Sequence, residues 1–272
     1  MAVRQAAAAR SSQARGMEID GAVILVTGAS RGIGRATAEL LARRGARVVC
    51  AGRDRAALES VATAVGGTAL VADLRDVDAA ARLVQQARAA YGRLDAVISN
   101  AGLGHVGPVA EMTAEQVATL VDVNVRATFL LGRAAVAAFA DQAAAGEHRQ
   151  RALCFVGSIA GAVGVPGESV YSATKAAGES FAALLREEVR GTGVAVSTVL
   201  PGVVDTEFLA RRGAAYDRRF PRPMSAACAA RGVVEAVERG TPRRIEPRWL
   251  AVPARLAGTA PVLYRALARR LS

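Results

Sequence analysis

The chain alternates short runs of Val, Ile, Leu and Ala with longer stretches in which apolar residues recur at helical spacing. Short apolar runs bounded by turn residues are typical of strands that are buried on both faces of a sheet. The pattern predicts strands over residues 22–27, 46–51, 67–72, 94–99, 152–157, 194–200 and 243–246. It predicts helices over residues 32–44, 54–65, 77–91, 113 to about 145, 169–190 and 225–239.

Two of these helices begin with capping residues: Asp54 can cap the second, and Thr113 with Gln116 forms a capping box. Strands buried on both faces and joined by helices form a parallel sheet with helices on both sides. We therefore expect the α/β class, a Rossmann-type, doubly wound parallel sheet of about seven strands, as a single domain over residues 21–246. Beyond it we expect a disordered extension over residues 1–20 and a basic, apolar helical extension over residues 247–272, packed on the domain or at an interface.

The distribution of charge narrows the choice of partners. The net charge is +11, but residues 1–210 hold 21 basic and 20 acidic side chains, whereas residues 211–272 hold 14 and 4. The excess is thus +1 in the first part and +10 in the second. Because no module that reads nucleic acid and no interleaved aromatic platform accompanies it, we expect no nucleic-acid binding.

Other patterns bear on metals and location. The cysteines, Cys50, Cys154 and Cys228, stand in apolar stretches without the spacing of metal ligands. We expect reduced, buried thiols, no metal site and a cytoplasmic protein. We also expect no membrane span, because no uninterrupted apolar run is long enough. The first sixteen residues lack the apolar core of a secretory signal.

Lys175 is the only lysine, in a chain that otherwise uses arginine for its permanent positive charges. It follows Tyr171 by four residues, which places both on one face of a helix. A compact ammonium next to a phenol lowers the phenol's pKa from its usual value of about 10. Tyr171 would then exchange a proton near neutrality. An exposed lysine beside a packing tyrosine would have the same spacing.

The first predicted strand runs directly into a glycine-rich turn, residues 27–34, and then into a helix. Glycines at such a turn let the backbone approach a pyrophosphate, whose charge lies over the helix N-terminus. The alternative is a tight turn without a ligand. Its place between the first strand and the first helix of an alternating pattern favours a dinucleotide site.

Five motifs, in order along residues 22–245, resemble those of the short-chain dehydrogenase/reductase family. They are Thr27-Gly-x-x-x-Gly-Ile-Gly34, Asn100-Ala101-Gly102 after the fourth strand, Ser158 after the fifth, Tyr171-x-x-x-Lys175, and Pro201-Gly202 after the sixth. Each motif alone is common by chance, whereas all five motifs together, on the expected strands and helices, are specific for the family. The resemblance implies an oxidoreductase that interconverts a carbonyl and a secondary alcohol with a nicotinamide cofactor.

The resemblance also implies a catalytic centre of Ser158, Tyr171, Lys175 and Asn124. Tyr171 would give a proton to the carbonyl oxygen or take it from the alcohol, and Ser158 would orient that oxygen. Lys175 would lower the pKa of the tyrosine and hold the nicotinamide ribose, and Asn124 would support a water chain to it. Asn124 could instead kink its helix or bond the backbone, and Ser158 could be a strand-end cap.

The choice of cofactor rests on the end of the second strand. An NAD site places an acidic side chain there, but Arg53 follows this strand and Arg31 lies in the glycine turn. Two arginines resemble the NADP-preferring members, where they bind the 2′-phosphate, so we expect NADP(H). Asp54 is one residue too late and serves better as a cap. The expected cofactor-binding residues are Gly28, Ser30, Arg31, Gly32, Ile33, Gly34, Arg53, Asp73, Leu74, Asn100, Ala101, Gly102, Tyr171, Lys175, Pro201, Gly202, Val204 and Thr206.

The substrate side is expected to be apolar. By resemblance, Val163, Val165, Val203 and Val204 line the pocket, and residues 206–224 form the mobile substrate loop. Its three aromatic residues among arginines suit an apolar substrate with one anionic group. They are Phe208, Tyr216 and Phe220. The two histidines, His105 near the expected substrate mouth and His148 in a charged loop, we expect to be solvated.

The chain continues beyond the last strand, which disfavours the family's 3-oxoacyl-carrier-protein reductases, since these end soon after it. We expect a lipid-, steroid- or aromatic-ketone-like substrate. The alternative is a catalytically silent member that senses NADP, and the complete catalytic set argues against it.

Residues 261–272 would place Leu263, Leu267 and Leu271 on one helical face. Such a helix could make a weak peripheral membrane contact or pack on the protein or across a subunit interface, and we prefer the second. The family resemblance also implies a homodimer or homotetramer that pairs through the helices at residues 113–145 and 169–190.

Overall fold

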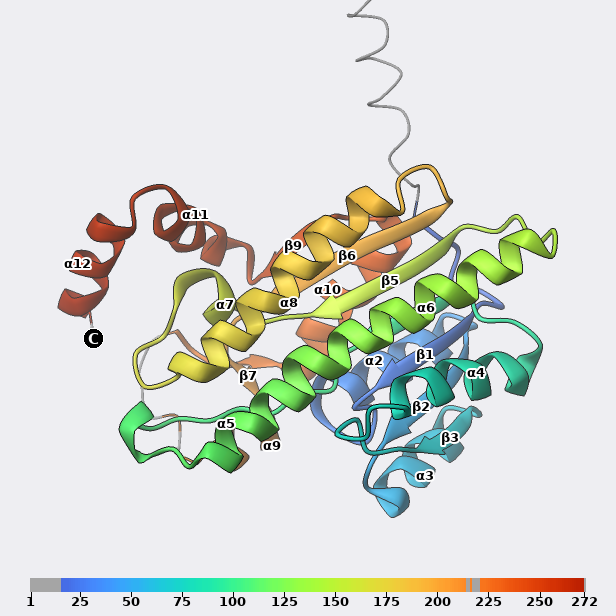
Figure 1. Ribbon diagram of the computed structural model, residues 1–272, viewed down its shortest axis with the longest axis horizontal. Helices are drawn as coiled ribbons and strands as arrows, with labels where there is room; N and C mark the ends of the chain where they lie inside the picture. The colour runs from blue at the N-terminus through green and yellow to red at the C-terminus, as the bar shows by residue number, and fades with distance from the viewer. Residues whose placement is uncertain (1–15, 214–215, 217–220, 272) are drawn as a thin grey trace, which may run out of the picture.

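The computed structural model describes residues 16–213, 216 and 221–271. At its centre lies a seven-stranded parallel sheet in the order β3-β2-β1-β4-β5-β6-β9 (Figure 1). The strands are β1 (Val23–Thr27), β2 (Arg47–Gly52), β3 (Thr68–Val71), β4 (Ala96–Ser99), β5 (Arg151–Val156), β6 (Val194–Pro201) and β9 (Arg243–Glu246). The strand order reverses between β1 and β4, the place where open α/β sheets bind their ligands.

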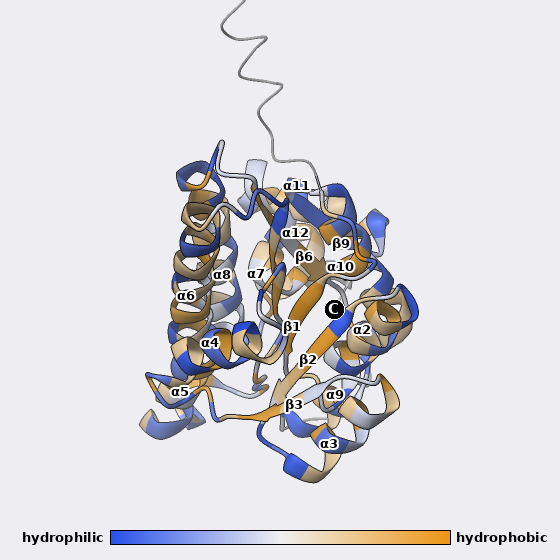
Figure 2. Ribbon diagram, turned by 90° about the vertical axis from the view of Figure 1, so that its right-hand side faces the viewer, coloured by the Kyte–Doolittle hydropathy of each residue, from blue (hydrophilic) through white to orange (hydrophobic). Residues whose placement is uncertain are grey.

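Helices cover both faces of this sheet (Figures 1 and 2). The helices α2 (Gly32–Arg43), α3 (Arg55–Ala64) and α10 (Ala226–Arg239) share one apolar core with the sheet. On the other face, α4 (Ala79–Tyr91), α6 (Ala127–Ala144) and α8 (Ser169–Glu188) form a second core. Strand β1 supplies both, since Ile24 and Val26 point to the first and Val23 and Leu25 to the second. Burial on both faces explains why these strands are continuous apolar runs.

The predicted fold class, a doubly wound parallel sheet of about seven strands, is confirmed. One helix differs from the prediction. The expected helix over residues 113–145 is divided into α5 (Ala114–Val121), a π-helical turn (Asp122–Arg126) and α6. Thr113 and Gln116 form the predicted capping box. Two short helices were not predicted, α7 (Ile159–Val163) and α9 (Glu207–Arg211), whereas α11 (Ala251–Thr259) and α12 (Pro261–Leu271) lie where a helical extension was expected.

Residues ahead of the predicted domain boundary at residue 21 pack on the domain. Met17 and Ile19 are buried in the core that α2 and α10 share, and the Met17 N–H donates to the Val237 carbonyl at 3.3 Å. Apolar side chains at these two positions dock residues 16–20 onto the domain. The rest of the expected disordered extension, residues 1–15, lies outside the described residues.

The helical run Ala114–Ala144 corrects another expectation. With 31 residues it is long and apolar enough to cross a membrane by length and composition, although we expected no such segment. In this fold the run lies along the sheet, where α6 packs on α4 and α8 and contributes Leu131 and Phe139 to the core. A helix that covers a parallel sheet needs the same apolar composition, which weakens the case for a membrane span.

The segment over residues 203–225 is held at its two ends. Val204–Asp205 (β7) and Met224–Ser225 (β8) pair as a small parallel ladder. Between them lies α9, which lines the same cavity as residues at the carboxyl ends of the main strands. After β9 the chain forms a 3-10 turn (Arg248–Leu250), then α11 and α12 at one end of the molecule (Figure 1). The active-site region is therefore covered by elements that come after the core of the sheet in the chain.

Candidate active site

A cavity of about 1090 Å³ opens at the carboxyl ends of the strands. Seventeen of the eighteen residues expected to bind cofactor line it, and so do Ser158 and the four expected substrate-side valines. The exceptions among the predicted site residues are Gly34 and Asn124, which lie behind the wall. The sheet thus brings together motifs that are up to about 180 residues apart in the sequence.

The glycine turn has the shape that a pyrophosphate requires. Gly28 has a φ of +65°, and a Cβ there would lie 2.9 Å from the Asn100 side-chain nitrogen. A Cβ on Gly34 would lie 2.1 Å from the Gly28 carbonyl oxygen, so Gly34 lets α2 close onto the turn. No side chain caps the first turn of α2. Its N–H groups and positive dipole end therefore fit a phosphate group.

Thr27 and Asn100 hold the ends of β1 and β4 at a fixed separation. The Thr27 hydroxyl accepts hydrogen bonds from the Asn100 and Ala101 N–H groups at 3.0 and 3.1 Å. The Asn100 amide donates back to the Thr27 carbonyl at 2.9 Å. These bonds use polar groups that would otherwise be buried without partners. Thr27, which we had quoted only as part of the motif, therefore sets the width of the cofactor cleft.

Arg31 lies between two carboxylates at the end expected to bind the 2′-phosphate. Its guanidinium nitrogens are 2.6 Å from Asp54 and 2.8 Å from Glu207. Asp54 also caps α3, because its other oxygen accepts from the Ala57 N–H at 3.2 Å. Arg53 is exposed in the cavity wall. Two arginines thus flank the expected site, and Glu207 is a partner of Arg31 that the sequence did not indicate.

Asp73 and Leu74 lie further along the same wall. Arg75 binds Asp73 through its N–H and two guanidinium nitrogens at 2.6–2.9 Å. These hydrogen bonds hold the pKa of the Asp73 carboxyl below its usual value. Arg75, which we did not predict, fixes the loop that would border the adenine.

Tyr171 stands in the first turn of α8, and its hydroxyl lies in the same cavity as that of Ser158. Burial raises the pKa of Tyr171 to about 12, and the neighbouring Ser158 hydroxyl acts in the opposite direction. Ser158 also caps α7, since its Oγ accepts from the Ala160 N–H at 3.2 Å. The capping function that we had weighed against a catalytic role is therefore present, and it holds the hydroxyl at a fixed point next to the tyrosine.

Lys175 differs in one respect from its expected role. Its ammonium donates to the Val156 carbonyl at 3.2 Å and lies 5.9 Å from the centroid of the Tyr171 ring. Burial lowers the pKa of Lys175 to about 8. We expected Lys175 to bring the pKa of Tyr171 down, but desolvation of the phenol dominates here because the ammonium is turned toward a carbonyl.

Asn124 lies near Lys175, and its side chain bonds the backbone. A Cβ on Gly102 would lie 3.2 Å from the Lys175 ammonium and 3.3 Å from the Asn124 side-chain oxygen. That oxygen accepts from the Leu103 N–H and the amide donates to the Leu103 carbonyl, both at 2.8 Å. The amide also contacts the Thr174 hydroxyl at 3.1 Å. The irregular helix and the backbone hydrogen bonds, which we had considered as alternatives to a catalytic role for Asn124, are therefore both present. Asn124 nevertheless lies beside Lys175.

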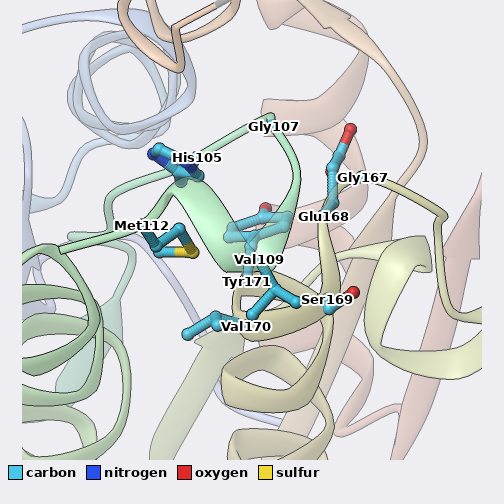
Figure 3. A pocket seen from close by; sticks show the side chains of 9 residues that line it. All are labelled: His105, Gly107, Val109, Met112, Gly167, Glu168, Ser169, Val170 and Tyr171. Atoms are coloured by element: carbon cyan, nitrogen blue, oxygen red, sulfur yellow. The ribbon is translucent and has the colours of Figure 1, made fainter. Parts of the chain in front are cut away.

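Glu168, Phe208 and Arg212 stand around Tyr171. The rings of Phe208 and Tyr171 lie 5.9 Å apart, and Arg212 forms an ion pair with Glu168 at 2.7 Å. Figure 3 shows Glu168 and Tyr171 close together at the start of α8, with His105 across from them. The closeness of Glu168 to Tyr171 can be read from the sequence, because they are three residues apart. Arg212 is 44 residues from Glu168, and no local pattern in the sequence indicates that they pair.

The C-terminal helices also reach the cavity. Leu250, Pro253 and Tyr264 line it, although the sequence predicted only that residues 247–272 pack on the domain or at an interface. Burial raises the pKa of Tyr264. These side chains come from three consecutive short elements after the sheet is complete. They add an apolar wall to the end of the cavity away from the glycine turn.

Comparison with known proteins agrees with this geometry. Residues 22–217 match the family model described as short chain dehydrogenase. An uncharacterized oxidoreductase of Myxococcus xanthus is 37% identical over 255 residues, which cover 91% of this chain and 96% of that protein. This match leaves little of either chain unaligned.

Two solved structures are similar. A short-chain dehydrogenase from Sphingobium yanoikuyae in complex with NADPH is 30% identical, with a TM-score of 0.74, and the match covers 87% of this chain and 94% of that one. A 3-ketoacyl-(acyl-carrier-protein) reductase from Brucella melitensis complexed with NADH is 25% identical, with a TM-score of 0.76 and coverages of 84% and 97%. The structural relatives therefore hold nicotinamide dinucleotides of both kinds.

Proposed function

The chain belongs to the short-chain dehydrogenase family, whose members transfer hydride between a nicotinamide cofactor and a carbonyl or alcohol carbon. From that premise we propose that it is an NADP(H)-dependent oxidoreductase that interconverts a largely apolar ketone and its secondary alcohol. The observation that carries the proposal is that Ser158, Tyr171 and Lys175 line the same cavity as the glycine turn. A proton donor thus faces the expected cofactor cleft.

The cofactor-binding half fits the expected group. The uncapped start of α2 and the glycines at positions 28 and 32 would hold the pyrophosphate through backbone N–H groups. Arg31 and Arg53 would bind the phosphate on the adenosine ribose, and Lys175 would hold the nicotinamide ribose. When bound, the cofactor supplies hydride to a carbonyl or accepts it from an alcohol.

The side chains of the catalytic wall handle the proton. Tyr171 donates its proton to the carbonyl oxygen in reduction and takes it back in oxidation. Ser158 binds the same oxygen and stabilises the charge that grows on it. With a pKa lowered to about 8, Lys175 can give up or accept a proton near neutrality, and a water chain supported by Asn124 would bring protons to it.

Two features favour NADP over NAD. Arg53 stands immediately after β2, where an NAD site would place an acidic residue on the ribose hydroxyls. Asp54, the acidic residue available nearby, is already used as the cap of α3 and as a partner of Arg31. The relatives bind NADH as well as NADPH, so the argument rests on these residues of the chain itself.

The substrate class follows from the walls of the remaining cavity. Val163, Val203, Phe208 and Pro253 present apolar surface toward it. Apolar walls favour a lipid-, steroid- or aromatic-ketone-like substrate over a small polar one. A 3-oxoacyl thioester, the substrate class named for the Brucella melitensis relative, is the second candidate.

A screen of NADPH oxidation against ketones of each class tests the proposal. We expect consumption of NADPH absorbance with apolar ketones, much slower consumption with NADH, and little reaction with small polar ketones. A catalytically silent protein that only senses NADP would bind NADPH through the same cavity, but it would not oxidise NADPH in the presence of any of the ketones.

The assembly and location of the protein are further parts of the proposal. The helices α6 and α8 lie side by side along one outer side of the molecule (Figure 2), and Leu184 on α8 is exposed. We expect two copies to pair through this side, as a homodimer or as half of a homotetramer, in the cytoplasm. A mass of one chain by light scattering at micromolar concentration would contradict the pairing.

The outer face of α12 suggests weak peripheral contact with an anionic membrane. Val262, Leu263 and Leu267 are 80%, 53% and 43% exposed, whereas Tyr264 and Ala268 face the protein. The segment over residues 247–272 carries five arginines and no acidic residue. Two copies of so basic a segment would repel each other at a subunit interface. An anionic membrane would instead attract the arginines through its headgroups and accommodate the leucines at its acyl boundary.

Vesicle flotation tests this contact. We expect the protein to float with anionic vesicles at low salt and not with neutral ones, and Leu263→Asp to remove the binding. Val77→Asp, at an exposed valine far from α12 in the chain, is the matched control and should float normally. No flotation of the native protein with anionic vesicles would refute the contact.

A further inference from the structure

Carboxylates hold the guanidinium of Arg31 on both sides. One terminal nitrogen lies 2.6 Å from the Asp54 carboxylate, and the other lies 2.8 Å from the Glu207 carboxylate. All three side chains line the main cavity. Arg31 is the arginine of the glycine turn that we expect to meet the 2′-phosphate of NADP. Each terminal nitrogen that such a phosphate could bind therefore already has an anionic partner.

The start of α9 lies against the glycine turn. A Cβ on Gly32 would lie 3.3 Å from the methyl carbon of Thr206, the residue directly before Glu207. The same turn borders the end of β2, since a Cβ on Gly52 would lie 3.7 Å from the Ser30 hydroxyl oxygen. In dinucleotide-binding sheets the adenosine ribose lies at the end of this strand. The Glu207 carboxylate therefore borders the region expected to hold the phosphate on that ribose.

The two carboxylates are not equally fixed. Asp54 also caps α3, because its other oxygen accepts from the Ala57 N–H. Glu207 is 61% exposed, and the oxygen that binds Arg31 also lies 2.9 Å from the guanidinium of Arg211. Ion pairs this exposed contribute about 0–1 kcal/mol. Glu207 can therefore exchange Arg31 for water and keep Arg211 as a partner, with no change in the backbone.

The two cofactors make different demands on Arg31. The 2′-phosphate of NADP carries more negative charge than a carboxylate and forms strong charge-assisted hydrogen bonds with a guanidinium. To bind Arg31 it must displace Glu207 or accept a negative charge close by, and either costs free energy. NAD has a hydroxyl at that position and leaves both ion pairs of Arg31 intact. The cost of Glu207 therefore falls on NADP alone.

We propose that Glu207 is a specificity-determining residue that competes with the 2′-phosphate for Arg31 and so narrows the preference for NADP over NAD. This competition presupposes the NADP(H) site of the proposed function. Arg31 keeps two anionic partners with either cofactor, Asp54 and Glu207 with NAD, and Asp54 and the phosphate with NADP. The chain can therefore accept NAD without leaving its phosphate-binding arginine short of negative charge.

Affinities for two adenosine fragments test the competition. The compounds 2′,5′-ADP and 5′-AMP differ only in the 2′-phosphate, and both lack the nicotinamide. By calorimetry, Glu207→Gln should bind 2′,5′-ADP roughly three- to fivefold more tightly than the native protein and 5′-AMP about equally. Glu59→Gln is the matched control, because Glu59 is an exposed glutamate that pairs with Arg55 along α3. This variant should bind both fragments as the native protein does.

A second background separates competition for Arg31 from repulsion through space. Arg31→Met should weaken 2′,5′-ADP by roughly tenfold, because one charge-assisted contact is lost. Adding Glu207→Gln to Arg31→Met should then change the affinity by less than about 1.5-fold, since there is no guanidinium left to compete for. A gain as large as in the native background would show repulsion alone and overturn the competition.

The other outcomes separate this proposal from the proposed function. Unchanged or weaker binding of 2′,5′-ADP in Glu207→Gln, or an equal gain for 5′-AMP, overturns the role of Glu207. If the native protein bound both fragments equally, the proposed NADP preference would fail, whereas a gain in Glu207→Gln would still support the competition. A protein inactive toward every ketone would refute the proposed reaction, and the fragment affinities would still decide on Glu207. In an active protein, the ratio of kcat/KM with NADPH to that with NADH should rise in Glu207→Gln by the same factor.

Discussion

The two ends of the cavity are built on different principles. At the glycine turn, between β1 and α2, the wall is backbone: positive φ at Gly28, an uncapped helix start and bonds from Thr27 to the end of β4. At the substrate end, residues 203–212, Tyr216, Pro221 and the C-terminal helices contribute side chains to the wall. There the contacts are an ion pair of Arg212, the ring of Phe208 and the apolar face of α11.

This difference separates cofactor binding, which the fold provides, from substrate recognition, which depends on the side chains of one particular chain. A backbone wall can bind any dinucleotide phosphate and tolerates change in most side chains nearby. A side-chain wall changes its shape and charge with single substitutions, so it can specify a substrate. The variants below act on one end, the other, or the catalytic wall between them, and their effects should fall in the order given.

Tyr171→Phe removes the proton donor where the two ends meet and should have the largest effect. Turnover should fall by roughly 10²–10⁴-fold, the usual contribution of a general acid, while NADPH binding followed by fluorescence stays unchanged. Tyr91→Phe is the matched control, because that hydroxyl bonds Thr68 at the far edge of the sheet. Near-native turnover in Tyr171→Phe would move the proton donor elsewhere in the cavity.

Lys175→Arg keeps the positive charge of the catalytic wall but enlarges the group that carries it. The ammonium donates to the Val156 carbonyl at 3.2 Å, and a larger planar guanidinium cannot place its charge at the same point. We expect turnover to fall by roughly a hundredfold, the effect of a misplacement of about 1 Å. Steady-state kinetics measure it, and near-normal activity would refute the argument from the single lysine.

Arg53→Ala acts on the phosphate-binding end and should change cofactor preference. Loss of one charge-assisted contact, about 1.5–3 kcal/mol, should weaken NADPH by roughly ten- to a hundredfold and leave NADH almost unchanged. Arg55→Ala serves as the control, since that exposed arginine pairs with Glu59 on α3. Equal weakening of both cofactors in calorimetry would make Arg53 a structural residue.

Two glycines test the claim that the cofactor wall is made of backbone. In Gly34→Ala the new methyl group would meet the Gly28 carbonyl, so we expect a loss of about 1–3 kcal/mol in stability together with weaker cofactor binding. In Gly178→Ala, on α8, nothing lies within 4 Å, and a gain of roughly 0.5–1 kcal/mol is expected. Thermal unfolding with and without NADPH compares them, and equal effects would contradict the tight fit at Gly34.

The same contrast explains what the sequence could predict. The strands and the glycine turn follow from local patterns, because burial on both faces demands apolar runs and a tight turn demands glycine. The last strand, Arg243–Glu246, was located to the residue, and the helix predicted over residues 225–239 begins one residue later, with Ser225 as its cap. These features need no knowledge of distant neighbours.

The substrate end could not be predicted in the same way. Glu168 meets Arg212 and Arg31 meets Glu207 only because the fold brings α9 to the cavity at the strand ends, and their separations of 44 and 176 residues leave no periodic trace. The direction of the Lys175 ammonium likewise depends on the position of the Val156 carbonyl at the end of β5. Burial raises the pKa of Tyr171, whereas the sequence, from the neighbouring Lys175 alone, led us to expect a lowered pKa.

The most direct test of the account follows hydride itself. The protein would be incubated with a panel of apolar ketones and NADPH that carries deuterium at the reactive nicotinamide carbon, and the products analysed by mass spectrometry. We predict an alcohol with one deuterium on the former carbonyl carbon, formed by the native protein and not by Tyr171→Phe. NADPH that remains unoxidised across the panel, with no labelled alcohol, would contradict the proposed oxidoreductase.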